Sequence, residues 1–226
     1  MKMKFAFLII LTIIICSFTM QTKKKIVFFG DSITEMGVQP EGYITRLGQL
    51  FKDKNLDKNY ELIGAGIGGN KVYDLYLRLE DDVLSKKPDA VVIWVGVNDV
   101  WHKKLAQTGT DPDKFEKFYE ALIRKFKERN ITVLLTTPAA IGERSDCSNE
   151  MDGDLNRYAS IIRNLAAKNN CTLVDLRKDF MDYLKTNNPE NKDRGILTTD
   201  GVHLNAAGNN FVAGKMYDAL HKSYIK

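Results

Sequence analysis

The chain has 226 residues, of which 44% are hydrophobic and 27% are charged, with 16 glycines and 5 prolines. This composition excludes a disordered or fibrous protein, and a chain of this length buries enough surface to fold without disulfides or a structural metal. The formal net charge of +4 comes from the first 25 residues, whose five lysines and no acids leave 28 basic against 29 acidic groups elsewhere. Because nucleic-acid binding needs a basic surface on the folded domain, we expect no nucleic-acid partner.

Residues 1–22 have the layout of a secretory signal peptide or an N-terminal membrane anchor, and a single domain is expected at 23–226. Two lysines precede an apolar run from Phe5 to about Cys16. The run is shorter than the ~20 residues of a spanning helix, which favours a cleaved signal over membrane attachment. We expect an exported protein, either periplasmic, at the cell surface or secreted. Cys16 lies where a lipoprotein carries its lipidated cysteine, but Ile15 stands where that pattern has a small residue, so lipidation stays an alternative.

Downstream of this leader, short apolar β-branched runs alternate with longer amphipathic segments. The expected strands cover 26–29, 61–63, 90–95, 131–136 and 172–176. The expected helices cover 41–54, 71–86, 112–129, 152–169 and 205–222. The strands are apolar at successive positions, which indicates that helices cover both faces of the sheet. The pattern predicts one α/β domain, a flavodoxin-like three-layer α/β/α sandwich around a parallel sheet of about five strands.

Two cysteines, Cys147 and Cys171, lie in this domain. The predicted helix between them separates the two positions by roughly 25 Å at 1.5 Å per residue. A disulfide needs Cα atoms within about 7 Å of each other. We therefore expect two free thiols, and we expect no metal site because the chain has no CxxC or HxxxH spacing.

The segments that directly follow the predicted strands are rich in glycine and polar residues. They are GDSIT at 30–34, GAGIGGN at 64–70, GVND at 96–99, TP at 137–138 and, before the last predicted helix, TDGVHLN at 199–205. Ligands of parallel α/β folds bind at the carboxyl ends of the strands, which meet at one edge of the sheet. We expect the functional site at this edge.

These segments contain the groups that nucleophilic catalysis requires. Ser32 supplies a hydroxyl, His203 a base that removes its proton, and Asp200 a carboxylate that orients the base. The oxyanion that forms during acyl transfer needs hydrogen-bond donors, and the backbone of Gly69 and the carboxamide of Asn98 can supply them. Each segment alone is more often an ordinary turn or helix cap. The hypothesis therefore depends on all of them occurring in order at strand ends.

The segment GAGIGG at 64–69 also matches the GxGxxG fingerprint of dinucleotide-binding folds. That fingerprint follows the first strand and needs an acid about 20 residues later, at the end of the next strand. Here it follows the second predicted strand, and the next strand ends near Asn98 and Asp99, about 30 residues later. A dinucleotide cofactor is therefore disfavoured.

In this combination the chain resembles the SGNH hydrolases, also called GDSL esterases and lipases. The four blocks of that family have counterparts in order at 30–33, 66–70, 96–99 and 200–203. The glycine block is also similar to that of carbohydrate acetylesterases and of platelet-activating-factor acetylhydrolase catalytic subunits. The family's glycine resembles the one directly before the polar residue, which selects Gly69 before Asn70. No GxSxG elbow surrounds Ser32, unlike in the α/β-hydrolase fold.

The resemblance implies a role for each matching residue and an activity. Ser32 corresponds to the nucleophile, His203 to the base and Asp200 to the acid. The oxyanion hole corresponds to the N–H groups of Ser32 and Gly69 and the side chain of Asn98. The family hydrolyses carboxylic esters and thioesters through an acyl-enzyme intermediate, without a metal or organic cofactor.

The chain has little length beyond the core fold with which to build a long acyl channel, so we expect a short acyl group. Export of the protein then favours O-deacetylation of a carbohydrate ester. A lysophospholipase or thioesterase-type lipid esterase is the alternative within the same chemistry. A non-catalytic carbohydrate-binding protein on the same fold is an alternative of another class, against which the intact set of expected catalytic residues argues. The oligomeric state stays open.

Two insertions, 101–111 and 138–151, lie near the expected site. Their polar residues, Glu143 among them, either line a sugar-binding rim or form a solvated surface. The residues expected to contact substrate are Asp31, Asn70, Trp101 and His102.

Overall fold

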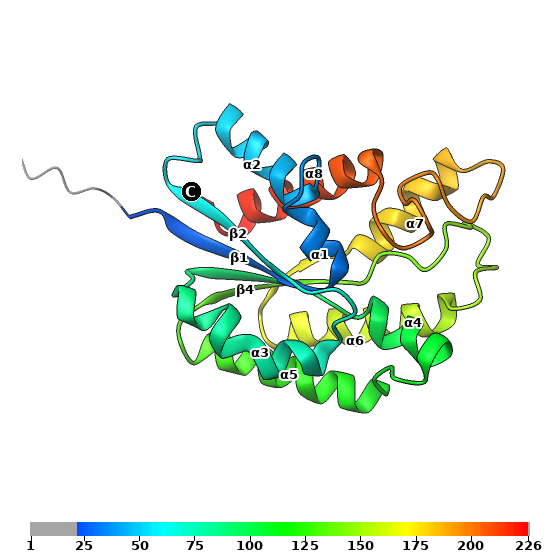
Figure 1. Ribbon diagram of the computed structural model, residues 1–226, viewed down its shortest axis with the longest axis horizontal. Coiled ribbons are helices and arrows are strands. Elements are labelled where there is room, and N and C mark those ends of the chain that lie inside the picture. The colour runs from blue at the N-terminus through cyan, green and yellow to red at the C-terminus, as the bar shows by residue number, and fades with distance from the viewer. Residues whose placement is uncertain (1–21, 226) are drawn as a thin grey trace, which may run out of the picture.

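The computed structural model describes residues 22–225, so the predicted leader up to residue 21, with Cys16, lies outside the described residues. Its centre is a parallel five-stranded sheet between two layers of helices (Figure 1). The strands are β1 (Lys24–Gly30), β2 (Tyr60–Gly66), β3 (Ala90–Trp94), β4 (Thr132–Thr136) and β5 (Thr172–Val174), in the spatial order β2-β1-β3-β4-β5. The predicted three-layer sandwich is confirmed. No helix within 22–225 is long and apolar enough to cross a membrane.

The helices divide between the two faces of the sheet (Figure 1). One face carries α1 (Ser32–Gly37), α2 (Tyr43–Asp53), α7 (Leu176–Asn187) and α8 (Ala206–Ser223). The other carries α3 (Val72–Asp82) with the 3₁₀ turn Leu84–Lys86, then α4 (Val97–Ala106), α5 (Pro112–Lys127) and α6 (Asp152–Lys168). All of β3 is buried because both faces are covered, as its apolar run predicts.

Three helices differ from the sequence-based expectation. The short helix α1 was not predicted, and α4 occupies most of the segment expected to be an insertion at 101–111. The buried residues of α4 are confined to its first turn, so its sequence has a weak helical period. The helix α7 begins directly after Asp175, its N-cap, whose side chain accepts from the N–H of Lys178. The strand β5 ends at Val174 and α7 begins at Leu176, so the strand predicted at 172–176 is two residues too long.

The helix α1 is held tightly against the sheet. The ring of Tyr43 packs edge-to-face on Phe28 and Trp94, with centroid distances of 5.9 and 5.4 Å, and its hydroxyl lies 3.2 Å from Thr34 Oγ1 in α1. A Cβ on Gly66, at the end of β2, would lie 2.0 Å from a backbone nitrogen of α1. The glycine is therefore needed for close packing of α1 on β2, which accounts for one glycine of the dinucleotide-like pattern.

Cys147 and Cys171 are both free thiols, as the sequence analysis predicts.

Candidate active site

Ser32 is the first residue of α1, one residue beyond the N-cap. The N-cap residue, Asp31, accepts a hydrogen bond from the N–H of Ile33 at 3.0 Å. The N–H groups of a first helical turn have no acceptor within the helix and carry the positive end of its dipole. The backbone N–H of Ser32 is therefore placed to stabilise a negative charge that develops beside its own hydroxyl.

Ser32, His203 and Asp200 form a continuous series of hydrogen bonds, although Ser32 and His203 are 171 residues apart in sequence. Ser32 Oγ lies 2.9 Å from His203 Nε2, and His203 Nδ1 lies 2.7 Å from Asp200 Oδ2. The other oxygen of Asp200 accepts from the N–H groups of Val202 and His203 at 2.9 and 2.8 Å. The Asp200 carboxylate thus holds the backbone of residues 200–203 and orients the His203 ring. This geometry suits a nucleophile, a base and an orienting acid.

Asp200 is kept ionised by its hydrogen bonds. Burial acts to raise the pKa of Asp200, but the His203 ring and the N–H groups of His203 and Val202 outweigh it and hold that pKa below its usual value. An ionised carboxylate at this position favours the His203 tautomer with its proton on Nδ1. His203 Nε2 is then available to accept the hydroxyl proton of Ser32.

The other two predicted oxyanion donors follow the neighbouring strands. Gly69, beyond β2, has a φ of +75°, a conformation that side-chain-bearing residues rarely adopt. Asn98 is 2% exposed at the start of α4, and its Nδ2 donates one hydrogen to the carbonyl oxygen of Asn70 at 3.1 Å. A carboxamide has two donor hydrogens, so one stays available to a ligand. The expected donors therefore lie at the ends of β1, β2 and β3, which are adjacent in the sheet.

Arg78, on α3, joins these strand ends and was missed in the sequence. Its guanidinium donates to the carbonyl oxygens of Gly30 and Ala65 at 2.7 and 3.1 Å and to Asn70 Oδ1 at 2.7 Å. It also pairs with Asp82 at 2.7 Å. The pairing with Asp82, four residues along the helix, is the part of this arrangement that sequence spacing can suggest.

Two buried carboxyl groups are adjacent in sequence to the expected donors Ser32 and Asn98. Asp31 is 2% exposed and Asp99 is fully buried, and desolvation is the main effect that raises the pKa of each to about 7. The carboxylate of Asp99 accepts from the N–H of Val72, the first residue of α3, at 3.2 and 3.3 Å. Asp31 was expected to contact substrate. Its burial and its bond to the backbone of α1 instead make it a support for the start of that helix.

Two of the other expected substrate contacts lie near His203 and Gly69. Trp101 and His102, on α4, are half-buried. The Trp101 ring stands edge-on to the His203 ring with a centroid distance of 6.3 Å, and His102 Cε1 is 3.8 Å from where a Cβ on Gly69 would lie. Burial and then the nearby charge of Lys71 lower the pKa of His102. Trp101 therefore borders His203, and His102 lies beside Trp101 and Gly69.

Asn70 and Glu143 make structural contacts; the expected contact of Asn70 with substrate stays a prediction. The side chain of Asn70 is half-buried and accepts from Arg78, as described above. Glu143 is fully buried, so it is part of neither a sugar-binding rim nor a solvated surface. Its carboxylate accepts from backbone N–H groups of the segment that precedes Asp200. Within 22–225, no group of three or more His, Cys, Asp or Glu side chains is arranged to hold a metal ion.

Comparison with known proteins gives consistent matches over most of the chain. The model of the GDSL-like lipase/acylhydrolase family matches residues 28–211. An acetylxylan esterase from Geobacillus stearothermophilus is 30% identical over 206 residues, which cover 84% of this chain and 90% of that protein. An uncharacterized lipoprotein of Bacillus subtilis, YqeF, is 25% identical over 172 residues, which cover 68% of this chain and 71% of that protein.

Solved structures agree with these relatives. The crystal structure of the acetyl xylan esterase AlAXEase matches with a TM-score of 0.86 at 66% identity and covers 87% of this chain and 99% of that one. A catalytic mutant of Axe2, an acetylxylan esterase from Geobacillus stearothermophilus, matches with a TM-score of 0.78 at 26% identity over 92% of this chain and 99% of that one. In that mutant a histidine is replaced by alanine, and in a second catalytic mutant of Axe2 a serine is replaced by alanine.

Proposed function

The chain belongs to the GDSL-like lipase/acylhydrolase family and hydrolyses ester bonds, and from that premise we propose that it removes O-acetyl groups from xylan or its oligosaccharides. The observation that carries the chemistry is the hydrogen-bonded series from Ser32 through His203 to Asp200. The similarity to acetylxylan esterases supports the choice of an acetylated sugar as substrate.

In the proposed reaction Ser32 Oγ attacks the acetyl carbonyl carbon while His203 Nε2 takes the hydroxyl proton. The carbonyl oxygen becomes negative and is held by the N–H groups of Ser32 and Gly69 and by Asn98 Nδ2. The tetrahedral intermediate collapses, the bond to the sugar oxygen breaks, and that oxygen takes the proton from His203. Asp200 stabilises the imidazolium throughout.

The second half of the reaction frees the enzyme. His203 Nε2 removes a proton from water, whose oxygen attacks the acetyl-Ser32 carbonyl carbon. Collapse of this second intermediate breaks the bond to Ser32 Oγ, which recovers its proton from His203, and acetic acid leaves. Each half of the reaction transfers one acyl group and moves one proton onto His203 and off it again, so His203 returns to its starting state.

We assign the sugar-contacting side to Trp101 and His102. Trp101 borders His203 and His102 lies beside Trp101 and Gly69, and an aromatic side chain beside polar groups suits the apolar faces and the hydroxyls of a sugar. The alternative substrate class is a lysophospholipid or other lipid ester. The two classes differ in acyl length, which a series of model esters separates.

We also propose that residues 1–22 export the domain at 23–226 and are either removed as a signal peptide or retained as an anchor. The layout of the leader and the similarity to a lipoprotein support export. Mass spectrometry of the exported protein tests this, because a mature N-terminus beyond Cys16 would eliminate lipidation at that residue.

The central test is hydrolysis of p-nitrophenyl esters from acetate to dodecanoate, and of acetylated xylo-oligosaccharides, by the purified domain. We expect activity confined to short acyl chains, and a loss in kcat of about 10⁴- to 10⁶-fold in Ser32→Ala. Ser85→Ala, which replaces an exposed serine, is the matched control and should keep full activity. A preference for long chains would favour the lipid alternative, and activity that survives Ser32→Ala would refute the catalytic assignment.

A further inference from the structure

The segment that carries Asp200 and His203 has little regular structure of its own. Residues 188–205 connect α7 to α8, and within this fully described stretch the backbone pairing is an isolated bridge between Thr198 and Leu204. A loop without a ladder of backbone hydrogen bonds needs other contacts to hold a catalytic group in one place.

Glu143 supplies such contacts from a segment about 50 residues earlier in the chain. Its carboxylate accepts three backbone hydrogen bonds, with Oε2 accepting from Ile196 and Oε1 from Leu197 and Thr198, each at 2.7 Å. The side chain is fully buried, so these bonds replace its contacts with water. Hydrogen bonds to a charged acceptor are shorter and stronger than neutral ones. Three consecutive residues of the loop are thereby fixed to one side chain.

The backbone around Glu143 reinforces this attachment. The N–H of Gly142 donates to the carbonyl oxygen of Gly201 at 2.9 Å, between Asp200 and His203. The N–H of Glu143 donates to the carbonyl oxygen of Asp193 at 2.9 Å. The loop is therefore held on both sides of Asp200.

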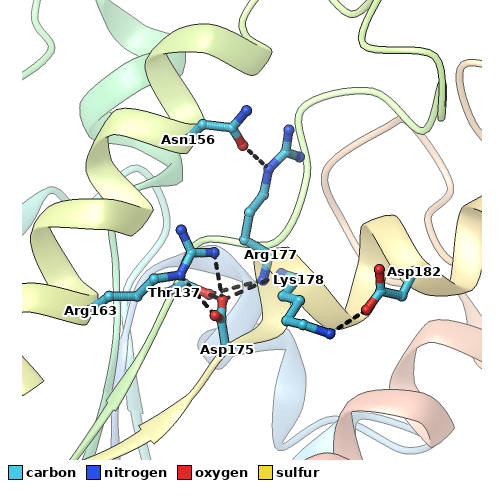
Figure 2. A network of polar contacts seen from close by, with 7 residues as sticks. All are labelled: Thr137, Asn156, Arg163, Asp175, Arg177, Lys178 and Asp182. Carbon is cyan, nitrogen blue, oxygen red and sulfur yellow. Dashed lines mark hydrogen bonds and ion pairs between the residues drawn. The ribbon is translucent and has the colours of Figure 1, made fainter.

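The segment that leads to Glu143 is itself anchored to rigid elements. Figure 2 shows Arg177, at the start of α7, reaching Asn156 on α6, and Nε donates to Asn156 Oδ1 at 2.7 Å. The same guanidinium donates to the carbonyl oxygen of Ala139 at 3.2 Å and pairs with the buried Asp152 at 2.6 Å. The N–H of Arg177 also donates to Thr137 Oγ1 at 2.9 Å. Residues 137–143 are therefore held in place by α6 and α7, and Glu143 in turn holds residues 196–198 of the loop.

We propose that Glu143 is a positioning residue for the hydrolysis, one that sets where Asp200 and His203 lie relative to Ser32. The inference rests on the proposed function, because it takes His203 as the base. A displacement of about 1 Å between reacting groups can cost on the order of 10²-fold in rate. Release of residues 196–198 therefore lowers the rate of the chemical step and leaves substrate contacts on α4 in place.

Two substitutions test this. Glu143→Gln keeps the shape and one acceptor oxygen, but its NH₂ group faces a backbone donor and cannot accept. Glu143→Ala removes all three bonds. On p-nitrophenyl acetate we expect kcat to fall about 10- to 100-fold in Glu143→Ala and less in Glu143→Gln, with KM within about twofold. If Glu143→Ala does not fold, Glu143→Gln carries the test.

Two further readouts separate positioning from loss of stability. The rate of inactivation by a fluorophosphonate, which modifies an activated serine, should fall by the same factor as kcat. Hydrogen–deuterium exchange should accelerate in peptides that cover 196–198. The control is Leu122→Ala, which truncates a buried residue of α5. Measured well below its Tm, it should lose stability while keeping kcat and the inactivation rate.

The outcomes for the inference and for the proposed function are distinct. If Ser32→Ala keeps its activity, the proposed function fails. If Ser32→Ala is inactive but both Glu143 variants keep kcat and the inactivation rate, the positioning inference alone is wrong. It is also overturned if Leu122→Ala loses as much kcat as the Glu143 variants.

Discussion

The two halves of the site are built differently. Ser32, Gly69 and Asn98 directly follow β1, β2 and β3, which are adjacent in the sheet. Asp200 and His203 lie instead in the connection between α7 and α8, where an isolated bridge is the backbone pairing. The nucleophile half therefore takes its geometry from a continuous ladder of parallel strands, and the base half takes it from side chains bonded to backbone.

This difference has a mechanical consequence. The register of three neighbouring strands is specified by many hydrogen bonds and by burial on both faces, so no single side chain decides it. The base half has the backbone bonds from Gly142 and Glu143, and beyond these it depends on two carboxylates, Asp200 and Glu143, each of which binds several N–H groups. One substitution can therefore displace the base half, whereas the nucleophile half loses function mainly through the reacting or donating group itself.

Among variants that keep Ser32, the largest expected effect comes from a substitution in the base half that creates no cavity. In Asp200→Asn the amide can stabilise the wrong His203 tautomer, and we expect kcat on p-nitrophenyl acetate to fall by about 10⁴-fold. Steady-state kinetics measure this change. Asp193→Asn alters an exposed carboxylate in the same loop and should keep the wild-type kcat. A loss below tenfold in Asp200→Asn would contradict the role assigned to this carboxylate.

Asn98→Ala tests the nucleophile half at a donor. Removal of the carboxamide leaves the strands in place but removes a donor to the oxyanion and the bond to the Asn70 carbonyl oxygen, and we expect a loss of about 10²- to 10³-fold in kcat. Single-turnover kinetics locate the loss in the acylation step. Gln49→Ala, which removes an exposed amide on α2, is the control. An unchanged kcat in Asn98→Ala would mean that the oxyanion assignment is wrong.

Arg78→Ala tests whether the nucleophile half needs its side-chain support, because the strands of the sheet already hold that half in place. The carbonyl oxygens of Gly30 and Ala65 and the side chain of Asn70 lose their donor. We expect kcat to fall only about tenfold, less than the loss at a displaced base. Arg78→Lys should recover part of it, since one ammonium cannot reproduce the guanidinium fork. The exposed Arg124→Ala is the control, and a loss as large as in Asn98→Ala would contradict this ranking.

The smallest effect on activity is expected from Asp31→Asn, which is instead a test of stability. Burial raises the pKa of Asp31 from 3.8 to about 7, so the folded state binds more protons than the unfolded state between those values. The free energy of unfolding therefore falls as pH rises from about 4 to 7, by a few kcal/mol at 1.36 kcal/mol per pKa unit.

The asparagine variant removes this titration, so its Tm should fall less between pH 4.5 and pH 8 than that of the wild type. Thermal unfolding across this range measures the difference, with the exposed Asp53→Asn as control. Parallel pH profiles for the wild type and Asp31→Asn would show that Asp31 is not the titrating group.

The sequence by itself determined the five strands and the class of the fold. It also identified Ser32, His203 and Asp200, which the structure brings together. Those features are local, because apolar runs reveal buried strands and short motifs mark the turns that follow them. It did not determine α1, which has only six residues, or α4, whose helical period is weak, or α7, which directly follows a strand.

The supports of the site were decided by the tertiary structure alone. Arg78 donates to Gly30, which is 48 residues away, and Glu143 binds Leu197, which is 54 residues away. Asp31, adjacent to Ser32 in sequence, proved to be buried. No local pattern encodes such contacts, because a polar side chain acquires its role from the backbone groups that folding brings around it, and burial then makes each unsatisfied partner costly.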